Sequence, residues 1–506
     1  MTMDKMDTSL SSRQRGLWVL LLLLVLFTRF YHLDQRPFHH DESLYAQKIW
    51  EYHQGEGYKF DPMTLGPFIF HAHQIPLFIL GDTEFAMRAL PALTGFILIL
   101  TLFFSRKIWG NTTALLAAAM FTVNPVFMYY QRYVRQDMYF SLFCLGAVIA
   151  LNRWLKTHTN KHFFLAATAL SLAASTKFEA YWFFLILAVF PLLTGFKSIK
   201  THLEHVNIKS LIVAGMIYLG ITVTLYTTFF TNIDAIQGMV YEWYQYWVQQ
   251  ENVSRIFYPA SHYNHLLLAY AILPMTICII GTITQIIQLL RKRPGGPKHL
   301  FLKGFLLWWS ILTCLFYAFM VRQKVPWFLV NMLVPAILLA AIYLSEFYQS
   351  RGSFKTKVWI TVLLAPLILY EAHTSIMACY RTSGDPSELI NYVHTSPQIP
   401  KLLDELENVA ESTGSGKQLP ILVTGHATWP LNYYLRNWTE VSYSMNVDPN
   451  KHMIVICNWE DRDRFESQLS SSHTMRKACL REWWLPKFSD LRHAGIWKSI
   501  WDWIIY

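Results

Sequence analysis

Two histidines and two carboxylates lie side by side in "HHDESLYA", residues 39–46, shortly after an apolar segment. Asp41 has two candidate roles. It could be the N-cap of a helix predicted over residues 43–53, or the general base that takes a proton from an acceptor hydroxyl. Glu42 would lie in the first helical turn, where the helix dipole favours a negative charge. The sequence leaves both roles of Asp41 open.

The histidines of this region are the second group that could do chemistry. His40 precedes the carboxylates, and His71 lies further along in "LGPFIFHAH". Imidazole nitrogens bind substrates and divalent cations, so both residues are candidates for either task. Because no recognised ligand spacing connects them, the sequence does not define a metal site.

Cations recur beside aromatic residues in the later loops. Asp137 lies where a membrane helix is predicted to start, so its carboxylate needs a cationic partner or a metal. Any single cation could be a snorkelling interfacial side chain. Several cations at one membrane depth instead suit an anionic headgroup, for which phosphate is the obvious candidate. The cations in "YYQRYVRQDMYF", "STKFEAYWF" and "VRQKVPWFLV" are Arg132, Arg135, Lys177, Arg322 and Lys324.

Apolar segments must position these residues. The chain has 506 residues, of which 53% are hydrophobic and 15% charged, a composition typical of a membrane protein. Hydropathy predicts about eleven transmembrane helices. The predicted fold is an α-helical polytopic membrane protein with a small C-terminal α/β soluble domain. The predicted spans are 16–33, 86–104, 111–128, 138–152, 162–176, 178–195, 210–230, 263–290, 300–320, 326–346 and 357–377.

Lys and Arg gather in alternate connections, which predicts the orientation of the helices. By the positive-inside rule these connections and the N-terminus are cytoplasmic. The loop 34–85 and the domain 378–506, which follows the transmembrane domain 1–377, are then extracytoplasmic. The net charge of +10 therefore reports the orientation of the helices in the membrane, and we expect no nucleic-acid partner.

The last part of the chain alternates helical and strand-like patterns. Helices are predicted over 387–396 and 400–409, and strands over 419–425 and 452–459. Among the six cysteines, Cys457 and Cys479 are the two that could form a disulfide. These patterns predict a small α/β domain.

The ordered motifs resemble the GT-C superfamily of integral-membrane glycosyltransferases, in particular the branch of protein O-mannosyltransferases and the aminoarabinose transferase of lipid A. The resemblance rests on the many-helix outline, "DE" in the first outer loop, "RYVRQD", "STKFEA", and "KVPW" followed by Pro335. "HHDESLYA", "LGPFIFHAH" and "HATWPLNYYLR" are similar to an uncharacterised prokaryotic branch, sometimes described as flippase-activity-associated.

The resemblance implies a polyprenyl-phosphate sugar as donor and transfer on the outer face of the membrane. The proposed base or acceptor-orienting group of the family matches Asp41, with Glu42 beside it, and the second acidic motif matches Asp137. These three are the predicted catalytic carboxylates. The basic residues that hold the donor phosphate match Arg135, Lys177 and Lys324.

The resemblance also allows the residues of a possible metal site to be compared. His262 is similar in position to a histidine that belongs to a metal site in the aminoarabinose transferase. The glutamate and lysine that precede the first-loop proline in that transferase are Leu65 and Gly66 here, so a metal site of that composition is not expected. His262 is therefore a candidate for substrate or metal binding.

A phosphate leaving group departs without a general acid, so one base and several cations suffice for transfer. We expect an inverting single displacement in which Asp41 takes the acceptor proton and Lys177, Arg322 and Lys324 stabilise the phosphate. The acceptor could be a glycan, a lipid or a protein. The alternative is a lipid-linked-sugar flippase or transporter, or its accessory. A transporter would place ionisable residues near the bilayer midplane, whereas here they gather at the outer helix ends.

Overall fold

The computed structural model describes residues 10–194, 204–242, 244, 259–291, 300–350, 353–385, 388–446, 454–469 and 474–483. The chain forms two compact units. The first comprises Met1–Gln35 and Asp41–Arg381, and the second comprises Arg36–His40 and Thr382–Tyr506. Some of the predicted spans, and the predicted C-terminal domain, extend beyond these ranges. Those parts lie outside the described residues.

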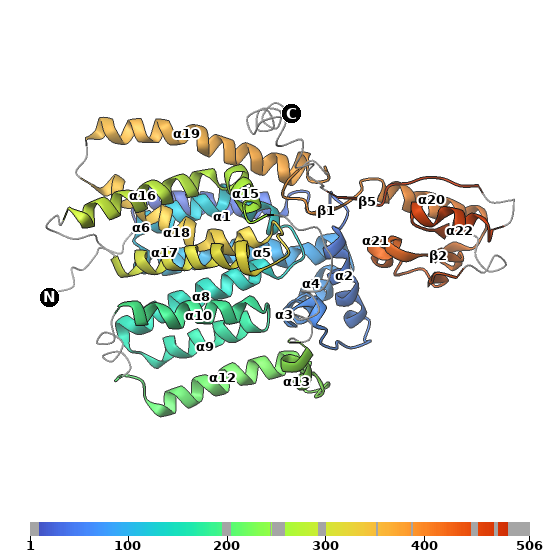
Figure 1. The fold of residues 1–506 in the computed structure, drawn as a ribbon, viewed down its shortest axis with the longest axis horizontal. Helices are drawn as coiled ribbons and strands as arrows, with labels where there is room; N and C mark the ends of the chain where they lie inside the picture. The colour runs from blue at the N-terminus through green and yellow to red at the C-terminus, as the bar shows by residue number, and fades with distance from the viewer. Residues whose placement is uncertain are drawn as a thin grey trace. The chain divides into compact units, whose positions relative to one another are not determined.

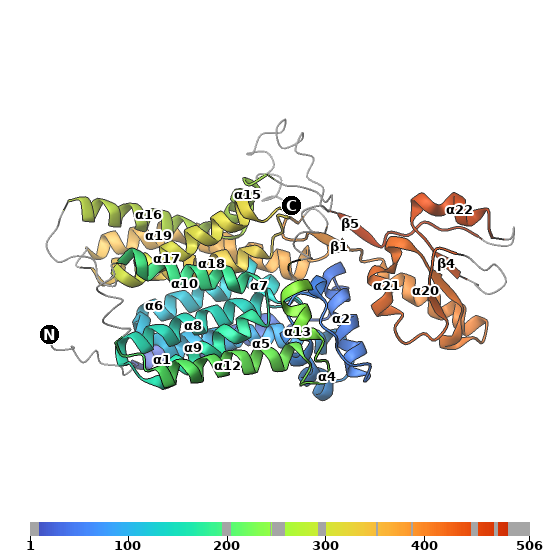
Figure 2. The same ribbon diagram turned by 60° about the horizontal axis from the view of Figure 1, so that its bottom comes forward.

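Helices make up the first unit, and most of them run alongside one another (Figure 1). The short helices α2, α3 and α4 gather at one end of this bundle in both views (Figure 2). The elements are α1 (Ser12–Phe30), α2 (His40–His53), η1 (Pro62–Thr64), α3 (Phe68–Ala72), α4 (Gln74–Leu80), α5 (Glu84–Trp109), α6 (Asn111–Val123), α7 (Pro125–Tyr130), α8 (Asp137–Thr157), α9 (Asn160–Ala174), α10 (Glu179–Thr194), α12 (Ile208–Tyr226), α13 (Ala235–Gln237), η2 (Gly238–Glu242), α15 (His262–Tyr270), α16 (Ile272–Leu290), α17 (Leu300–Leu315), η3 (Phe316–Met320), α18 (Phe328–Gln349), α19 (Phe354–Ile376) and η4 (Met377–Arg381).

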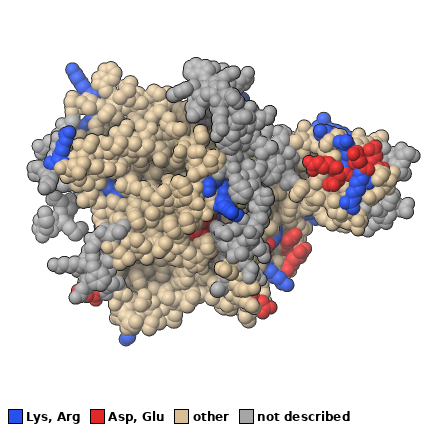
Figure 3. Space-filling view, viewed as in Figure 1, with Lys and Arg blue, Asp and Glu red and all other residues tan. Residues whose placement is uncertain are grey.

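Seven helices among the described residues are long and apolar enough to cross a membrane, and three more apolar helices are shorter. The viewed face of the bundle carries few charged side chains (Figure 3), as expected of a surface in contact with lipid. In the apolar window of α18, 94% of the residues are buried. This helix packs against α6, α8, α16 and α17, so it forms the centre of the unit.

Two of the predicted spans are each divided into two helices. The span predicted over 111–128 is interrupted at Asn124, whose side chain caps α7, and Pro125 at the first position cannot continue the preceding hydrogen-bond ladder. The span predicted over 263–290 is interrupted at Ala271, which has φ −148°. In both places the prediction of one continuous helix was wrong, because hydropathy does not respond to a local break in the backbone.

The start of α2 differs from the predicted helix over 43–53. The helix begins at His40, so Asp41 lies inside the first turn, and its predicted role as N-cap was wrong. The Asp41 carboxylate instead meets the guanidinium of Arg135.

The first loop closes tightly against the segment that leads into α10. The Gly66 N–H donates to the carbonyl of Thr176 at 3.1 Å, and the Phe68 N–H donates to that of Ser175 at 2.9 Å. A Cβ at Gly66 would lie 2.3 Å from the Ser175 carbonyl oxygen, closer than atoms can approach without a shift. Only glycine therefore fits at this position, and the contact fixes the backbone directly before Lys177.

The second unit is α/β. A parallel sheet of order β3-β2-β4 is formed by Val441–Tyr443, Ile421–Val423 and Ile454–Ile456. A separate antiparallel pair joins β1 (Val393–Thr395) to β5 (Arg481–Trp483). The remaining elements are α20 (Ile399–Ser412), η5 (Gly416–Gln418), η6 (Gly425–Ala427), α21 (Thr428–Tyr434), η7 (Trp459–Asp461) and α22 (Arg462–Glu466).

The core of this unit is formed mainly by α20, α21 and β2. The helix predicted over 387–396 was wrong, because β1 occupies its end. The strands predicted around β2 and β4 are present, and Cys457, one of the two cysteines considered for a disulfide, is a free thiol.

A short segment from the beginning of the chain is built into the second unit. The Phe38 N–H donates to the hydroxyl of Tyr434 at 2.7 Å, and the Phe38 ring packs on that of Tyr433 with 4.9 Å between centroids. The Val393 N–H donates to Nε2 of His39 at 3.2 Å. Residues 36–40 are thus held by segments that lie more than 350 positions later in the chain.

Candidate active site

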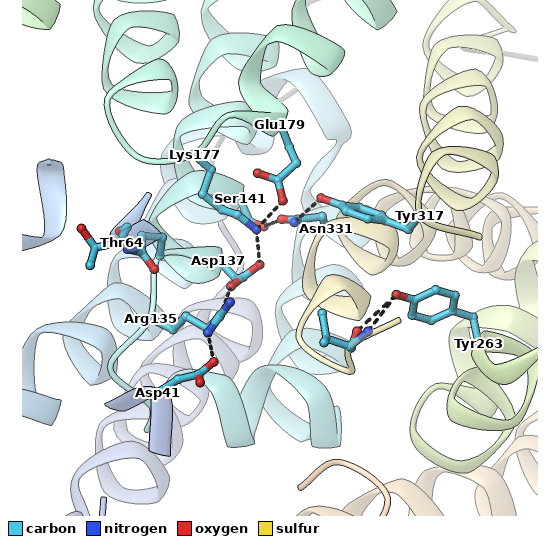
Figure 4. Close-up of polar contacts among 12 residues, drawn as sticks. Asp41, Thr64, Arg135, Asp137, Ser141, Lys177, Glu179, Tyr263, Tyr317 and Asn331 are labelled. Atoms are coloured by element: carbon cyan, nitrogen blue, oxygen red, sulfur yellow. Dashed lines mark hydrogen bonds and ion pairs between the residues drawn. The ribbon is translucent and has the colours of Figure 1, made fainter. Parts of the chain in front are cut away.

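Five charged side chains form a continuous series of ion pairs at the starts of helices α2, α8 and α10 (Figure 4). Arg135 donates from Nη1 to Asp41 and from Nε to Asp137, the latter at 3.1 Å. Lys177 Nζ contacts Asp137 Oδ1 at 2.8 Å and Glu179 Oε1 at 2.8 Å. Negative and positive groups therefore alternate along the whole series.

Burial increases along the series from Asp41 to the pair formed by Asp137 and Lys177. The side chain of Asp41 is 24% exposed and that of Arg135 is 11% exposed. Asp137 and Lys177 are each 1% exposed. Since charges this deep are costly without partners, the inner pair must stay paired, and Asp41 is the carboxylate most accessible to a substrate.

The central helix supplies aromatic rings to both cations. The guanidinium carbon of Arg135 lies 3.7 Å from the centroid of the Trp327 ring, and Nζ of Lys177 lies 4.9 Å from that of Phe328. Both rings come from the entrance to α18. Cation–π contacts of this kind hold a cation in place while keeping water away from it.

Local structure fixes the carboxylates. Asp137 and Glu179 are the first residues of α8 and α10, where unpaired backbone N–H groups and the helix dipole favour negative charge. The Gln136 amide donates from Nε2 to the carbonyl of Thr64 at 2.8 Å, which ties the start of α8 to the first loop. Glu179 was not among the predicted site residues. Its signal was its position two residues after Lys177, at the start of an apolar run.

A small cavity of about 20 Å³ lies beside Glu179, with walls that are mostly apolar and aromatic but include several polar side chains. The hydroxyl of Ser141 donates to Oδ1 of Asn331 at 2.7 Å, and Nδ2 of Asn331 donates to the hydroxyl of Tyr317 at 2.8 Å (Figure 4). All four side chains line the cavity. Its volume is enough for about one water molecule, and its walls provide the polar partners that a buried water needs.

Lys324 has a different environment from Lys177. Its ammonium donates to the backbone carbonyl of Val321, and among the described residues it makes no ion pair with a carboxylate. It is 6% exposed, and this burial lowers the pKa of its ammonium. The hydroxyl of Tyr263 bonds to the backbone N–H and carbonyl of Val325 at 3.2 and 3.3 Å and holds this loop (Figure 4).

His262 lies within electrostatic reach of Lys324. Burial, and then the positive charges of His265 and Lys324, lower the pKa of His262 to about 4. The imidazole is therefore neutral at pH 7 and acts as a donor or acceptor of hydrogen bonds rather than as a cation.

Three other predicted residues are His40, His71 and Arg322. The ring of His40 belongs to the second unit and lies 6.4 Å from the Trp429 ring. His71 Nε2 bonds to the carbonyl of Leu225 at 2.8 Å, and Arg322 is exposed. Within the described ranges, no three or more His, Cys, Asp or Glu side chains gather so that they could hold a metal ion.

Glu42, the third predicted catalytic carboxylate, is buried and does not face the same space as Asp41. Both of its carboxylate oxygens are bonded at 3.0 Å to the guanidinium of Arg88 on α5, and neither side chain is exposed. Arg88 was not predicted, because its partner lies 46 positions away and no local pattern connects them.

Comparisons with known proteins place this geometry in context. Residues 64–226 match the family model for dolichyl-phosphate-mannose-protein mannosyltransferases. No curated protein sequence matches the chain.

Two solved structures have a similar fold. ArnT from Cupriavidus metallidurans, solved with bound undecaprenyl phosphate, has a TM-score of 0.62 and 14% identity over 93% of this chain and 98% of that chain. The archaeal oligosaccharyltransferase AglB from Archaeoglobus fulgidus, in complex with an inhibitory peptide and a dolichol-phosphate, has a TM-score of 0.54 and 14% identity over 85% of this chain and 64% of that chain. The fold of this integral membrane protein is thus similar to those of ArnT and AglB, and residues 64–226 match a mannosyltransferase family model, in agreement with the resemblance that its motifs predicted.

Proposed function

We propose that the protein is a glycosyltransferase that moves a sugar from a polyprenyl-phosphate donor to an acceptor hydroxyl. The main observation behind the proposal is the accessible carboxylate of Asp41 at the end of a series of buried ion pairs. Beside it, on the loop before α18, Lys324 contacts a backbone carbonyl and, among the described residues, no carboxylate. The GT-C fold supports a lipid-linked donor, because related structures contain undecaprenyl phosphate and dolichol-phosphate.

The reaction needs one proton transfer and one displacement. Asp41 takes the proton of the acceptor hydroxyl as its oxygen attacks the anomeric carbon from the side opposite the phosphate. The bond between that carbon and the phosphate oxygen breaks, and the polyprenyl phosphate leaves as an anion. The product has inverted anomeric configuration, and the proton leaves Asp41 to water.

Lys324 is the best candidate for the phosphate-binding cation. Lys177 and Arg135 already contact two carboxylates each, so their charges are largely neutralised. Lys324 contacts a backbone carbonyl, and a buried ammonium without a counter-charge gains most from a bound anion. Arg322, two residues earlier, would assist at the exposed side. We assign to Lys177 and Arg135 the task of holding Asp137 and Asp41.

Arg135 links donor binding to the base. Its contact with Asp41 holds that carboxylate in place and also makes it a weaker proton acceptor. A donor phosphate would offer the guanidinium a third anion besides Asp41 and Asp137, and a shift of Arg135 toward the phosphate would release Asp41 for catalysis. The base would then become active when a donor is bound, which limits side reactions.

A divalent cation is a separate proposal. Because the described residues bring together no group of three metal-binding side chains, the steps above are written for the side chains alone. His262 and His71 are the predicted histidines that belong to the first unit, and they would be the candidates to contribute to such a site. Adding Mg²⁺ or Mn²⁺ to chelator-treated protein and measuring transfer tests whether a cation contributes.

The acceptor and the membrane face belong to the proposal as well. The site lies at the end of the bundle where α2, α8 and α10 begin. If this end is extracytoplasmic, it would receive an acceptor glycan, lipid or protein of the cell envelope. The orientation is tested with single-cysteine variants in the loop 34–85, which are labelled in intact cells with a membrane-impermeant thiol reagent.

Transfer by the purified protein is the decisive measurement for the function. Protein in lipid nanodiscs is incubated with a radiolabelled undecaprenyl-phosphate hexose, and release of free or transferred sugar is followed. Cells that lack the protein should accumulate a polyprenyl-phosphate sugar and lose one envelope glycan substituent, which mass spectrometry detects. Movement of the lipid-linked sugar across vesicles, without transfer to any acceptor or to water, would instead establish the flippase alternative.

The position of the charges favours transfer over transport. Asp137 and Glu179 begin their helices, and Asp41 lies in a first turn, so the ionisable groups lie at helix ends rather than at mid-span. A transporter requires a site that opens alternately to both sides and is found near the bilayer midplane.

Donor affinity should depend on the protonation of Lys324. The lowered pKa means that the ammonium loses its proton, and with it the attraction for phosphate, at a lower pH than the ordinary value of about 10.4. Affinity for a polyprenyl-phosphate sugar, a phosphodiester without a proton to lose in this range, should therefore fall as pH rises through that lowered pKa.

Lys324→Arg should keep its affinity to higher pH, because a guanidinium stays protonated. Native mass spectrometry of donor binding between pH 7 and about pH 10 measures the effect, and Lys303→Arg, at a buried lysine that pairs with the partly exposed Glu346, serves as control. Identical pH dependence in wild type and Lys324→Arg would remove Lys324 from the phosphate site.

A further inference from the structure

Glu42 and Asp41 are neighbours in the chain, yet their carboxylates do different things. The carboxylate of Glu42 is fully buried and forms a bidentate ion pair with Arg88, Nε to Oε1 and Nη2 to Oε2, both at 3.0 Å. Its Oε1 also accepts the N–H of Val134 at 3.0 Å. To act as a base, Glu42 would have to give up both of its bonds to a buried guanidinium, which is far more costly than releasing the Asp41 carboxylate, whose side chain is 24% exposed.

The pair joins four segments of the chain. Arg88 on α5 donates from Nη1 to the carbonyl of Leu33, which follows α1, at 3.1 Å, and contacts Glu84 one turn earlier at 3.4 Å. Glu42 lies in the first turn of α2, and Val134 lies in the loop before α8. The end of α1 and the starts of α2 and α8 are therefore all tied to one point on α5.

Two adjacent contacts connect α2 to the loop before α8. Asp41 meets the Arg135 side chain, and Glu42 meets the Val134 backbone N–H, so consecutive residues on one segment bind consecutive residues on the other. A single contact would leave the two segments free to rotate about it. Two contacts fix both the separation and the orientation of the Asp41 carboxylate relative to Arg135.

We propose that Glu42 and Arg88 are positioning residues that set the geometry of Asp41 and Arg135, and that Glu42 does not itself exchange protons with the acceptor. The expected change in kcat rests on the proposed function, whereas the effect on the structure of the loop before α8 can be measured without activity. Precise placement matters, because a displacement of about 1 Å at a reacting group costs on the order of 10²-fold in rate.

The test removes both charges together. Glu42→Met/Arg88→Met replaces the buried ion pair by apolar side chains of similar size, a change that buried pairs often tolerate without loss of stability. The Val134 N–H then has no acceptor. The matched control is Lys303→Met/Glu346→Met, which removes another ion pair with a buried lysine. Glu42→Gln, with Arg88 intact, keeps an oxygen for the Val134 N–H.

Amide hydrogen–deuterium exchange and donor hydrolysis are measured on the full chain in nanodiscs. For the apolar double variant we expect faster exchange in the peptide containing Val134 and Arg135, and a fall in kcat on the order of 10²-fold. Its KM for the undecaprenyl-phosphate hexose should change little. The acid limb of its pH–rate profile should persist, because the base is still present. Glu42→Gln should recover part of the rate, and the control should match wild type.

Each outcome decides one part. Exchange and kcat equal to wild type in the double variant would overturn the positioning role, as would faster exchange with unchanged kcat. Loss of the acid limb would make Glu42 the base and also overturn the inference. If the wild type does not hydrolyse the donor, the proposed function fails, and the exchange measurement alone still decides whether Glu42 holds the loop.

Discussion

Asp41→Asn should lower kcat for sugar transfer by a factor on the order of 10² to 10⁴, the usual contribution of a general base. The amide keeps the shape of the side chain and one oxygen for the Arg135 guanidinium, so the ion-pair series loses a charge but little geometry. The KM for the donor should change little, because Asp41 lies on the acceptor side of the reaction. Rates of donor hydrolysis and of transfer at saturating donor measure the effect.

Asp61→Asn is the matched control for that experiment. Asp61 lies in the same first loop, pairs with Lys48 at 2.5 Å, and is 35% exposed in its side chain. It has the same residue type, a cationic partner and a similar exposure, but it does not belong to the ion-pair series. A wild-type rate in Asp41→Asn, or an equal loss in Asp61→Asn, would exclude Asp41 as the base.

Gly66→Ala should abolish most of the activity without touching any charged group. The added methyl would lie 2.3 Å from the Ser175 carbonyl oxygen, 2.5 Å from its carbon and 2.8 Å from the Thr176 carbonyl carbon. All three are backbone atoms, so relief requires the two segments to separate. Overpacking of this kind destabilises by about 1–3 kcal/mol. Displacement of the backbone before Lys177 would in addition cost on the order of 10²-fold in kcat.

Gly220→Ala provides the comparison. Gly220 lies inside α12 with nothing within 4 Å of its would-be Cβ, so alanine there should stabilise the helix by about 1 kcal/mol. Thermal unfolding and donor hydrolysis are measured on both variants. Equal activity of Gly66→Ala and wild type would mean that the contact between the first loop and the segment before Lys177 does not position the site.

The sequence was most informative about the helices, because span length and apolar composition are properties of contiguous residues. It was less informative where one local event changed the backbone. Asn124 with Pro125 starts a new helix inside an apolar run, and Ala271 interrupts another, without any drop in hydropathy. The starts of α8 and α10 at Asp137 and Glu179 agree with the predicted boundaries to within a residue.

Most residues of the site could be predicted from the sequence, but the contacts between them could not, and the reason is a different one. Residue types and the aromatic surroundings identified Asp41, Arg135, Asp137 and Lys177 as candidates, and the structure brings these four together. Which carboxylate meets which cation depends on how each helix is rotated about its axis, and hydropathy carries no such information. Asp41 and Arg135 are 94 positions apart. For the same reason nothing in the sequence separated the buried Glu42 from its accessible neighbour.

The chain passes between its two compact units three times, after residues 35, 40 and 381. A single cut near residue 381 would therefore yield a truncated protein rather than an independent module. Such a truncation would strip Phe38 and His39 of Tyr434 and Val393, their partners in the second unit, immediately before Asp41. Loss of activity on deletion of the C-terminal region would then report a frayed N-terminal segment as readily as a lost acceptor site. The two parts are best dissected by point substitution, and engineering by domain exchange should move residues 36–40 together with 382–506.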